Sequence, residues 1–243
     1  MVQILKNAGN YEILTPTEWL PTQLLLIEKA GRTCYQSERG PITPKTADKF
    51  IRMLIKLGHH SQLEHSWLMA QFNDCSRGFT HEVVRHRLAA FSQESTRYVD
   101  YSSTPSGDNE PDLAKFSIKF IVPPHRDENL SIALSDGRTM TLAEMAKETE
   151  EFYRALRKAG WKPEDARQIL PNGIKSQITI SCNFREWRHI FFMRTAIFAH
   201  WEIRPVMCSL LRELKTIIPV MFEDFVEKGI DDNGIPYFEQ IKL

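Results

Sequence analysis

The fourteen-residue stretch RHRLAAFSQESTRY, residues 85–98, contains three arginines, one histidine and two serines. Its first three residues, Arg85–Arg87, are adjacent cationic side chains, and a solvated helix face does not need such a run. Arginine suits phosphate because its planar fork donates to two oxygens at once. Ser95 and Arg97 add a hydroxyl and a further fork. The stretch therefore predicts a site for a ligand with several acceptors, or for ligands on two sides of a helix. Because the sequence has no G-x-G-x-x-G and no G-x-x-x-x-G-K-[ST], we do not expect a glycine-rich phosphate loop.

A second group of side chains lies in GHHSQLEH, residues 58–65. His60, Glu64 and His65 are metal-ligating types, but their spacing fits neither H-E-x-x-H nor H-x-x-E-H. A catalytic zinc is therefore the weakest interpretation. Histidines that close a helix and start a strand are a second, and a ligand-binding turn is the one we favour.

The third group is NFREWRHIFFMR, residues 183–194. Arg185 and His189 are four residues apart and share one face of the predicted helix. Arginines at such positions are usually salt-bridge partners on a protein surface. Arg194 differs because apolar residues flank it, and a charge in an apolar setting should be paired or functional.

The first half of the chain predicts helices and strands that carry these groups. We expect strands at 2–5 and 11–14 and a helix over about 17–30 that closes at Gly31. A second helix should begin after Thr43 with Pro44 at its first position and end at Gly58. Its core face is predicted to hold four residues at helical spacing: Phe50, Met53, Leu54 and Leu57. A strand at 66–73 and a helix over about 76–89 follow, with Arg85–Arg87 near the end of that helix. Beyond it we expect an irregular stretch that holds Ser92 to Arg97.

The second half continues the mixed pattern. A strand ends at the prolines after Val122, and residues 125–138 read as an exposed connection. Thr141 and Glu144 form a capping box for a helix to Gly160. A short helix lies between Pro163 and Pro171, a strand covers 177–183, and Asn183 caps the helix that follows. The last helix, over about 200–217, contains Pro205, which should kink it or mark its start. The fold class predicted is α+β: a mostly antiparallel or mixed sheet packed against long helices, in a single domain spanning 1–243.

Composition narrows the function classes. The chain has 243 residues, 31 basic and 31 acidic side chains, and a formal net charge of zero. A general nucleic-acid-binding protein would carry a basic excess. The four cysteines are far apart and form no C-x-x-C pair, which favours reduced thiols. With no signal peptide and no apolar run of membrane-spanning length visible, we expect a cytoplasmic protein with no membrane partner.

The triplet Arg85–Arg87, seven further residues and Ser95 match R-H-R-x7-S, and the chain thereby resembles the flavin-dependent thymidylate synthase family. Further likeness occurs in the same order at GHHSQLEH, THEVVRHR, STRYV, DARQILP (165–171), NFREWRHIFFMR and AHWEIR. The resemblance covers roughly residues 25–215. It does not cover about 102–140, and an insertion peculiar to this chain is one interpretation of that interval.

The resemblance implies a reductive methylation of dUMP to dTMP. The one-carbon unit comes from 5,10-methylenetetrahydrofolate, which leaves as tetrahydrofolate, and the electrons come from NADPH through FAD. In such a reaction the cofactor carries the hydride chemistry and the protein supplies orientation and electrostatics. The resemblance also implies a homotetramer. It implies no metal.

The same resemblance implies roles for individual residues. The predicted flavin contacts are Ser61, Arg85, His86, Arg87, Gln93, Asn183, Arg185 and His189. The predicted dUMP contacts are Glu82, Arg85, Gln93, Glu94, Ser95, Thr96, Arg97, Arg167 and Arg194. Arg97 and Arg167 would bind the phosphate, and Arg194 would favour negative charge on the uracil. His59 and His65 are expected neighbours of Ser61.

Two points stay open at this level. Ser95 is the one nucleophile of the motif, but no base is evident beside it, so we favour a nucleotide-binding hydroxyl over a catalytic nucleophile. Glu82 stands where the family often has glutamine, and His189 where it often has asparagine. Both keep hydrogen-bonding ability.

The competing hypotheses are a nucleic-acid-binding protein that uses Arg85–Arg87 and a zinc hydrolase built on His60, Glu64 and His65.

Overall fold

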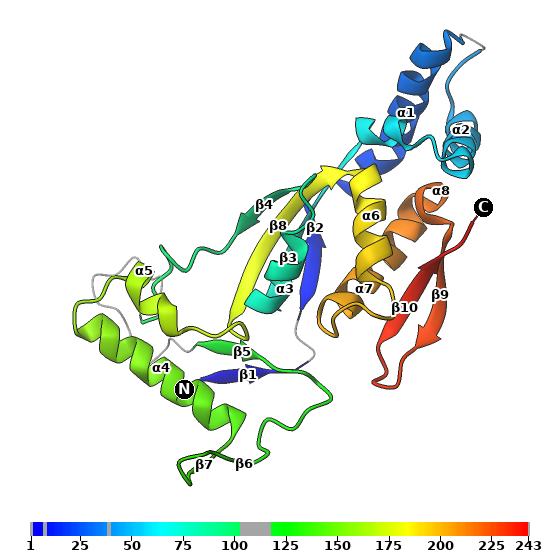
Figure 1. The fold of residues 1–243 in the computed structure, drawn as a ribbon. Coiled ribbons are helices and arrows are strands. Elements are labelled where there is room, and N and C mark those ends of the chain that lie inside the picture. The colour runs from blue at the N-terminus through cyan, green and yellow to red at the C-terminus, as the bar shows by residue number, and fades with distance from the viewer. Residues whose placement is uncertain (1, 7–8, 38–39, 103–117, 243) are drawn as a thin grey trace. The chain divides into compact units, whose positions relative to one another are not determined.

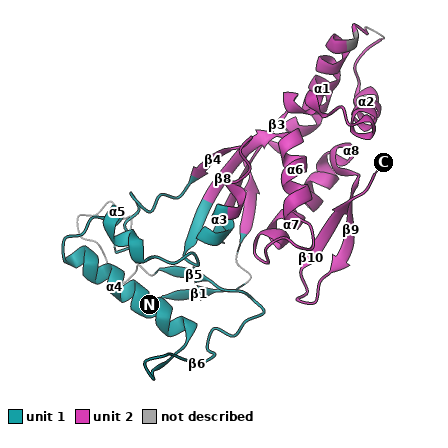
Figure 2. Ribbon diagram, viewed as in Figure 1, with its two compact units in different colours: residues 1–9, 73–81, 93–177 teal, residues 10–72, 82–92, 178–243 magenta. Residues whose placement is uncertain are grey.

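A computed structural model describes residues 2–6, 9–37, 40–102 and 118–242. The chain forms two compact units, one of residues 1–9, 73–81 and 93–177 and the other of residues 10–72, 82–92 and 178–243 (Figure 2). We call them unit 1 and unit 2. Four elements contain residues of both units: β3 (Trp67–Ser76), α3 (Arg77–Val83), β4 (Ala90–Gln93) and β8 (Lys175–Asn183).

A four-stranded sheet in the order β2-β3-β8-β4 is the largest sheet of the described residues (Figure 1). Strand β2 (Asn10–Ile13) lies at one edge of this sheet, next to β3. Along β8 the residues alternate between half-buried and buried, so Ile178, Ile180 and Cys182 share one buried face. This period of two is the sequence pattern that predicts a strand here. The predicted strands at 11–14, 66–73 and 177–183 are thus confirmed within a few residues.

Unit 1 has a core between a small parallel sheet and helices. Strand β1 (Gln3–Leu5) pairs in parallel with β5 (Lys119–Ile121), and β6 (Ile132–Ala133) pairs antiparallel with β7 (Thr139–Met140). The helices are α4 (Leu142–Lys158), α5 (Pro163–Ala166) and the 3-10 turn η3 (Arg167–Ile169). The core contains seven buried residues: Tyr101, Ile118, Phe120, Ala146, Tyr153, Ala166 and Ile174.

The capping box predicted for α4 is present. Thr141 Oγ1 accepts from the Glu144 N–H at 3.1 Å, and Glu144 Oε2 accepts from the Thr141 N–H at 2.7 Å. Part of the interval considered as an insertion, residues 103–117, lies outside the described residues. Its later part is not peripheral, because Ile118, Phe120 and Val122 are buried. The single-domain prediction and the insertion remain predictions.

Unit 2 holds most of the helices. These are η1 (Thr17–Trp19), α1 (Leu20–Tyr35), α2 (Pro44–Leu57), η2 (His60–His65), α6 (Phe184–Arg194), α7 (Ile203–Ile217) and α8 (Pro219–Phe222). A hairpin of β9 (Phe225–Ile230) and β10 (Pro236–Gln240) ends the described chain. Neither α8 nor this hairpin was predicted from the sequence. Pro205 lies in the first turn of α7. Of the two predictions, a kink or the start of the helix, the second is confirmed.

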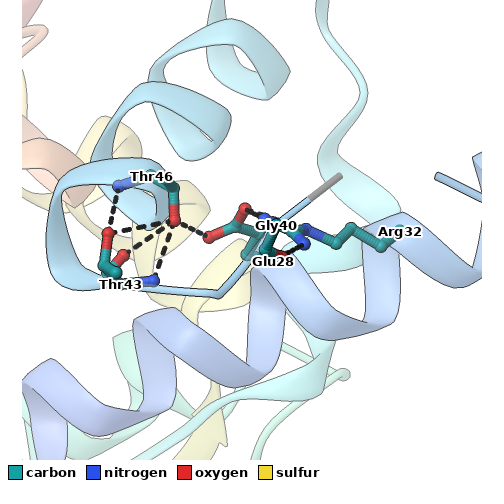
Figure 3. Close-up of polar contacts among 5 residues, drawn as sticks. All are labelled: Glu28, Arg32, Gly40, Thr43 and Thr46. Atoms are coloured by element: carbon teal, nitrogen blue, oxygen red, sulfur yellow. Dashed lines mark hydrogen bonds and ion pairs between the residues drawn. The ribbon is translucent and has the colours of Figure 1, made fainter. Parts of the chain in front are cut away.

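Glu28 ties α1 to α2. Its buried carboxylate accepts from Arg32 Nε at 3.0 Å and from Thr46 Oγ1 at 2.7 Å (Figure 3). Arg32 Nη1 also donates to the Gly40 carbonyl at 2.6 Å, and Thr43 caps α2. A buried carboxylate is stable here because charged and polar donors surround it.

Three expectations about unit 2 were wrong in detail. Helix α1 does not close at Gly31 but runs on to Tyr35. A Cβ at Gly31 would lie 2.2 Å from Phe50 Cζ, so this glycine lets two helices approach rather than ending one. On α2 the buried face is Ala47, Ile51, Leu54 and Ile55, whereas Met53 and Leu57 are exposed.

The third difference concerns the cationic triplet. Helix α3 ends at Val83, not at about 89, and the triplet lies in two successive turns. In these turns the His86 N–H donates to the Val83 carbonyl at 3.1 Å and the Ala89 N–H donates to the His86 carbonyl at 3.0 Å. The chain leaves α3 here and enters β4 at Ala90, and part of the predicted irregular stretch is this strand.

Candidate active site

The turns after α3 separate the three side chains of the triplet. His86 is buried, at 5% exposure, while Arg85 and Arg87 on either side of it are exposed. The guanidinium groups therefore reach solvent and the imidazole points inward. This is a turn geometry rather than the 100° spacing of a helix.

Helix α6 supplies the facing side chains. Asn183 caps it, because its side-chain oxygen accepts from the Glu186 N–H at 2.9 Å. One side of α6 buries Trp187, Ile190 and Phe191, and this burial fixes the rotation of the helix. The predicted cap is confirmed.

A cavity of about 910 Å³ in unit 2 lies between these two elements. This volume is within the range of roughly 300–1,000 Å³ that is usual for ligand sites. Six predicted site residues line it: Arg85, His86, Arg87, Arg185, His189 and Arg194. The other lining residues are His60, Leu88, Glu186, Arg188, Phe192, Met193 and Gln240.

Arg194 is held on three sides. Its Nε donates to His86 Nε2 at 3.0 Å, Nη2 donates to the Glu82 carbonyl at 2.7 Å, and Nη1 forms an ion pair with the Glu82 carboxylate. A guanidinium has five N–H groups. In the described part of the chain three of them are thus engaged, and two remain for a ligand. The expectation that Arg194 is paired or functional is met by the pairing.

His86 is neutral in this setting. Burial, then the Arg194 charge and then His189, lower the pKa of His86 to about 4. An Arg Nε–H can only donate, so His86 Nε2 accepts and its proton resides on Nδ1. The Nδ1 atom lies 3.4 Å from Glu186 Oε1, and the rings of His86 and His189 meet edge to face at 5.5 Å between centroids.

Two other predicted contacts of unit 2, Ser61 and Asn183, do not line the cavity. Ser61 is exposed in η2 and donates to Gln62 Oε1 at 3.2 Å, and Asn183 serves as the cap of α6. Arg185 lines the cavity and also forms an ion pair with Glu64. In GHHSQLEH it is His60 that reaches the cavity, and burial lowers its pKa.

The described side chains that lie close enough together to bind a metal ion are not His60, Glu64 and His65, the residues of the zinc hypothesis. Among the described residues, one group of three His, Cys, Asp or Glu side chains has its ligand atoms within 4.8 Å of one another: His86, Glu186 and His189. The cluster of His60, Glu64 and His65 is not formed. The Arg194 guanidinium donates to His86 Nε2, so its positive charge would repel a metal cation at His86, Glu186 and His189.

The remaining predicted residues lie in unit 1 around Glu164. Arg97 Nε donates to Glu164 Oε2 at 2.7 Å, and Arg167 Nε donates to the Glu164 carbonyl at 3.1 Å. Arg167 also reaches Thr96 Oγ1 at 3.2 Å, and the Arg97 N–H donates to Ser95 Oγ at 3.3 Å. Two arginines, a threonine and a serine therefore gather in one place, which is a donor set suited to phosphate.

Gln93 and Glu94 are tied into the structure of unit 1. Gln93 Nε2 donates to Thr80 Oγ1 at 2.6 Å. Glu94 accepts from the Tyr101 hydroxyl at 2.5 Å and from Lys175 Nζ at 3.1 Å. The burial of Tyr101 and its bond to Glu94 raise the pKa of that phenol, which keeps it a donor.

Several residues that line the cavity were not predicted from the sequence. Glu186 follows its cap by three positions, so its natural reading is a capping-box residue, and nothing marks it as a neighbour of His86. Arg188 was not predicted because an arginine at such a position of a helix is usually a salt-bridge partner on the protein surface. Gln240 lies 46 residues beyond Arg194 in an unpredicted strand, so only tertiary structure could place it.

Comparison with known proteins defines the class to which this fold and site belong. The family model described as "Thymidylate synthase complementing protein" matches residues 17–220. A flavin-dependent thymidylate synthase of Mycobacterium marinum is 35% identical over 220 residues, which cover 86% of this chain and 82% of that protein. One of Corynebacterium diphtheriae is 35% identical over 217 residues with the same coverage. This chain therefore belongs to the flavin-dependent thymidylate synthase family.

Solved structures confirm the α+β fold. A UMP/dUMP methylase, PolB, of Streptomyces cacaoi bound with 5-Br UMP aligns with a TM-score of 0.62 and 21% identity, over 91% of this chain and 94% of that one. Thymidylate synthase X of Helicobacter pylori with FAD and dUMP aligns with a TM-score of 0.59 and 20% identity, over 89% and 98% of the chains. None of the described helices is both long and apolar enough to span a bilayer.

Proposed function

We propose that this protein is a flavin-dependent thymidylate synthase that converts dUMP to dTMP with 5,10-methylenetetrahydrofolate and NADPH. Family membership supports the activity. The observation that carries the site is the single cavity lined by Arg85–Arg87 and by Arg185, His189 and Arg194, two segments about 100 residues apart. Balanced over the whole reaction, NADPH is oxidised to NADP⁺ and the folate leaves as tetrahydrofolate.

The cavity in unit 2 fits FAD by its chemistry. Arg85, Arg87 and Arg185 offer donors to a pyrophosphate, while Leu88, Phe192 and Met193 offer apolar surface to a ring. His60 and Arg188 also line the cavity, and the buried His60 Nε2 and Arg188 Nε atoms have no hydrogen-bond partner among the described residues. Buried polar atoms without partners are rare, so a ligand acceptor there is a reasonable partner. When bound, FAD would pass reducing equivalents from NADPH to the methylation reaction.

Two groups of residues, one in each unit, are proposed to contact dUMP. Arg97 and Arg167 are proposed to bind phosphate, with Glu164 as the acid that the phosphate displaces from Arg97. Ser95 and Thr96 would donate hydroxyl hydrogen bonds. Arg194, with two N–H groups unengaged, would stabilise negative charge that develops on the uracil, which is electrostatic stabilisation by a preorganised donor.

Assembly as a homotetramer is part of the proposal. Phe192 and Met193 at the cavity wall are exposed apolar side chains, and two more follow in the sequence, Ile197 and Phe198, the last 96% exposed. A large exposed apolar patch is typical of an interface. Sedimentation equilibrium should give four times the chain mass of 28.2 kDa, and a monomer at micromolar concentration would contradict this part of the proposal.

One experiment tests the central claim. Purified protein, oxidised and then reduced with dithionite, should show flavin absorbance that bleaches on reduction and shifts when dUMP is titrated in. With NADPH and 5,10-methylenetetrahydrofolate added, dTMP should form. A colourless protein that does not take up FAD and forms no dTMP would overturn the function.

A further inference from the structure

Glu186 is a buried carboxylate that the proposed contacts with flavin and nucleotide leave unused. It is 5% exposed, and burial raises its pKa. It stands at the third position of α6, where its backbone N–H is capped by Asn183. In α4 the glutamate at this position, Glu144, turns back to close a capping box. The Glu186 carboxylate instead faces His86.

His86 connects Glu186 to Arg194. Its Nδ1 lies 3.4 Å from Glu186 Oε1, and its Nε2 accepts from Arg194 Nε at 3.0 Å. Both contacts require the same neutral tautomer, with the proton on Nδ1. The distance of 3.4 Å is long for a hydrogen bond, but such bonds commonly tighten when a substrate binds. All three side chains belong to unit 2 and line one cavity.

The surroundings of Glu186 and His86 favour a neutral imidazole. Burial raises the pKa of Glu186, and the charges of His189 and Arg185 on α6 oppose only part of this rise. The positive charge of Arg194 disfavours a cationic His86. From α3, Glu82 balances Arg194 on its other side. An acid that fixes the tautomer and orientation of a histidine is a known way to orient a third group.

We propose that Glu186 is a positioning residue: it holds the His86 ring with its proton on Nδ1, so that a bare Nε2 fixes the Arg194 guanidinium. The inference rests on the proposed function, because it assigns Arg194 a task that only a pyrimidine nucleotide reaction would reveal. Through His86, Glu186 acts on the direction of the two free N–H groups of Arg194. It does not touch the substrate.

The first test needs no substrate and is made on the wild-type protein. Solid-state ¹⁵N NMR of histidine-labelled protein as purified, at pH 8, should show His86 with a protonated Nδ1 and a bare Nε2. The signals are assigned by their loss in His86→Gln. A proton on Nε2, or a doubly protonated ring, would overturn the proposal.

The second test compares Glu186→Leu with Glu186→Gln. Leucine removes the acceptor, and glutamine keeps an acceptor oxygen without the charge. In Glu186→Leu the His86 ring signals should shift and kcat should fall on the order of 10²-fold, because a small misorientation of a catalytic group costs about that much. KM for dUMP and bound FAD should stay within about twofold of wild type. Glu186→Gln should restore both the ring signals and most of kcat.

The matched control is Glu150, a buried carboxylate of α4 in unit 1 that ion-pairs with Arg154. Glu150→Gln should leave the His86 signals and kcat unchanged, which separates positioning from a general loss of stability. A Glu186→Leu protein with wild-type ring signals, or with wild-type kcat, would overturn the inference. If wild-type protein forms no dTMP, the proposed function fails while the NMR result still decides the contact of Glu186 with His86.

Discussion

At the scale of single residues, the site depends on what surrounds each charge. Arg194 looks anomalous in the sequence because apolar residues flank it, and the structure supplies Glu82 and His86 as its partners. These partners matter because a half-buried guanidinium without acceptors would be costly. The same burial keeps His86 neutral and able to accept.

Replacing Arg194 tests the role proposed for its charge. Arg194→Ala should lower kcat for dTMP formation by about 10²–10³-fold, the usual cost of losing one donor to a developing negative charge. FAD should remain bound, because Arg85, Arg87 and Arg185 are unchanged. Steady-state kinetics and flavin absorbance after gel filtration measure the two quantities. Normal turnover in this variant would remove Arg194 from the mechanism.

Replacing Ser95 separates its two interpretations. Its Oγ accepts from the Arg97 N–H, and no described contact places a base beside it. Ser95→Ala should therefore weaken dUMP binding by about 1 kcal/mol, the usual value of one hydrogen bond, and retain substantial turnover. Titration of dUMP against flavin absorbance gives the affinity. Loss of turnover with unchanged dUMP affinity would favour the nucleophile instead.

At the scale of elements, caps and periodicity decide where helices begin, and packing decides where they end. Thr43 and Thr141 begin α2 and α4 as predicted, because their side chains satisfy local N–H groups. The ends of α1 and α3 were wrong, because Gly31 packs against Phe50 and the chain turns after Val83 to enter β4.

A Gly31 substitution tests the packing of α1 on α2. Alanine normally favours a helix over glycine by about 1 kcal/mol. Here its Cβ would lie 2.2–2.3 Å from Phe50 ring atoms, so we expect a net loss of about 1–2 kcal/mol in the free energy of unfolding. Urea denaturation measures it. In a Phe50→Leu background the same change should be less destabilising, and an equal loss in both backgrounds would refute the contact.

At the scale of the whole molecule, the buried histidine links stability to acidity. The pKa of His86 is about 4 in the folded protein, against 6.5 for an unperturbed histidine. The unfolded chain therefore binds a proton at this site before the folded chain does. The stability that a neutral His86 contributes is present above about pH 6.5 and is lost as the pH falls toward 4.

The expected size of this effect is up to about 3 kcal/mol in the free energy of unfolding between pH 7 and pH 4. Because other groups also titrate in this range, the measured quantity is a difference. Urea unfolding of wild type and of His86→Gln should be compared at pH 7, 5.5 and 4. The variant should lose less stability on acidification. Parallel pH dependences would show that His86 does not titrate as stated.

Local sequence patterns were enough to predict the α+β class, the capped starts of α2, α4 and α6, and the importance of Arg85–Arg87. These depend on local rules: side-chain caps, proline geometry, and periods of 2 and 3.6 residues. The R-H-R-x7-S spacing also led to the family, because such a motif lies within one short stretch of chain.

Which residues share the cavity depends on long-range packing of the folded chain. Residues 82–88 and 185–194 meet because β4 and β8 are neighbours in one sheet. Strand β4 follows residues 82–88, and β8 leads directly into α6, which contains residues 185–194. Such long-range contacts leave no local pattern in a single sequence. The facing of Glu186 and His86, and the tautomer that it implies, arises from that pairing alone.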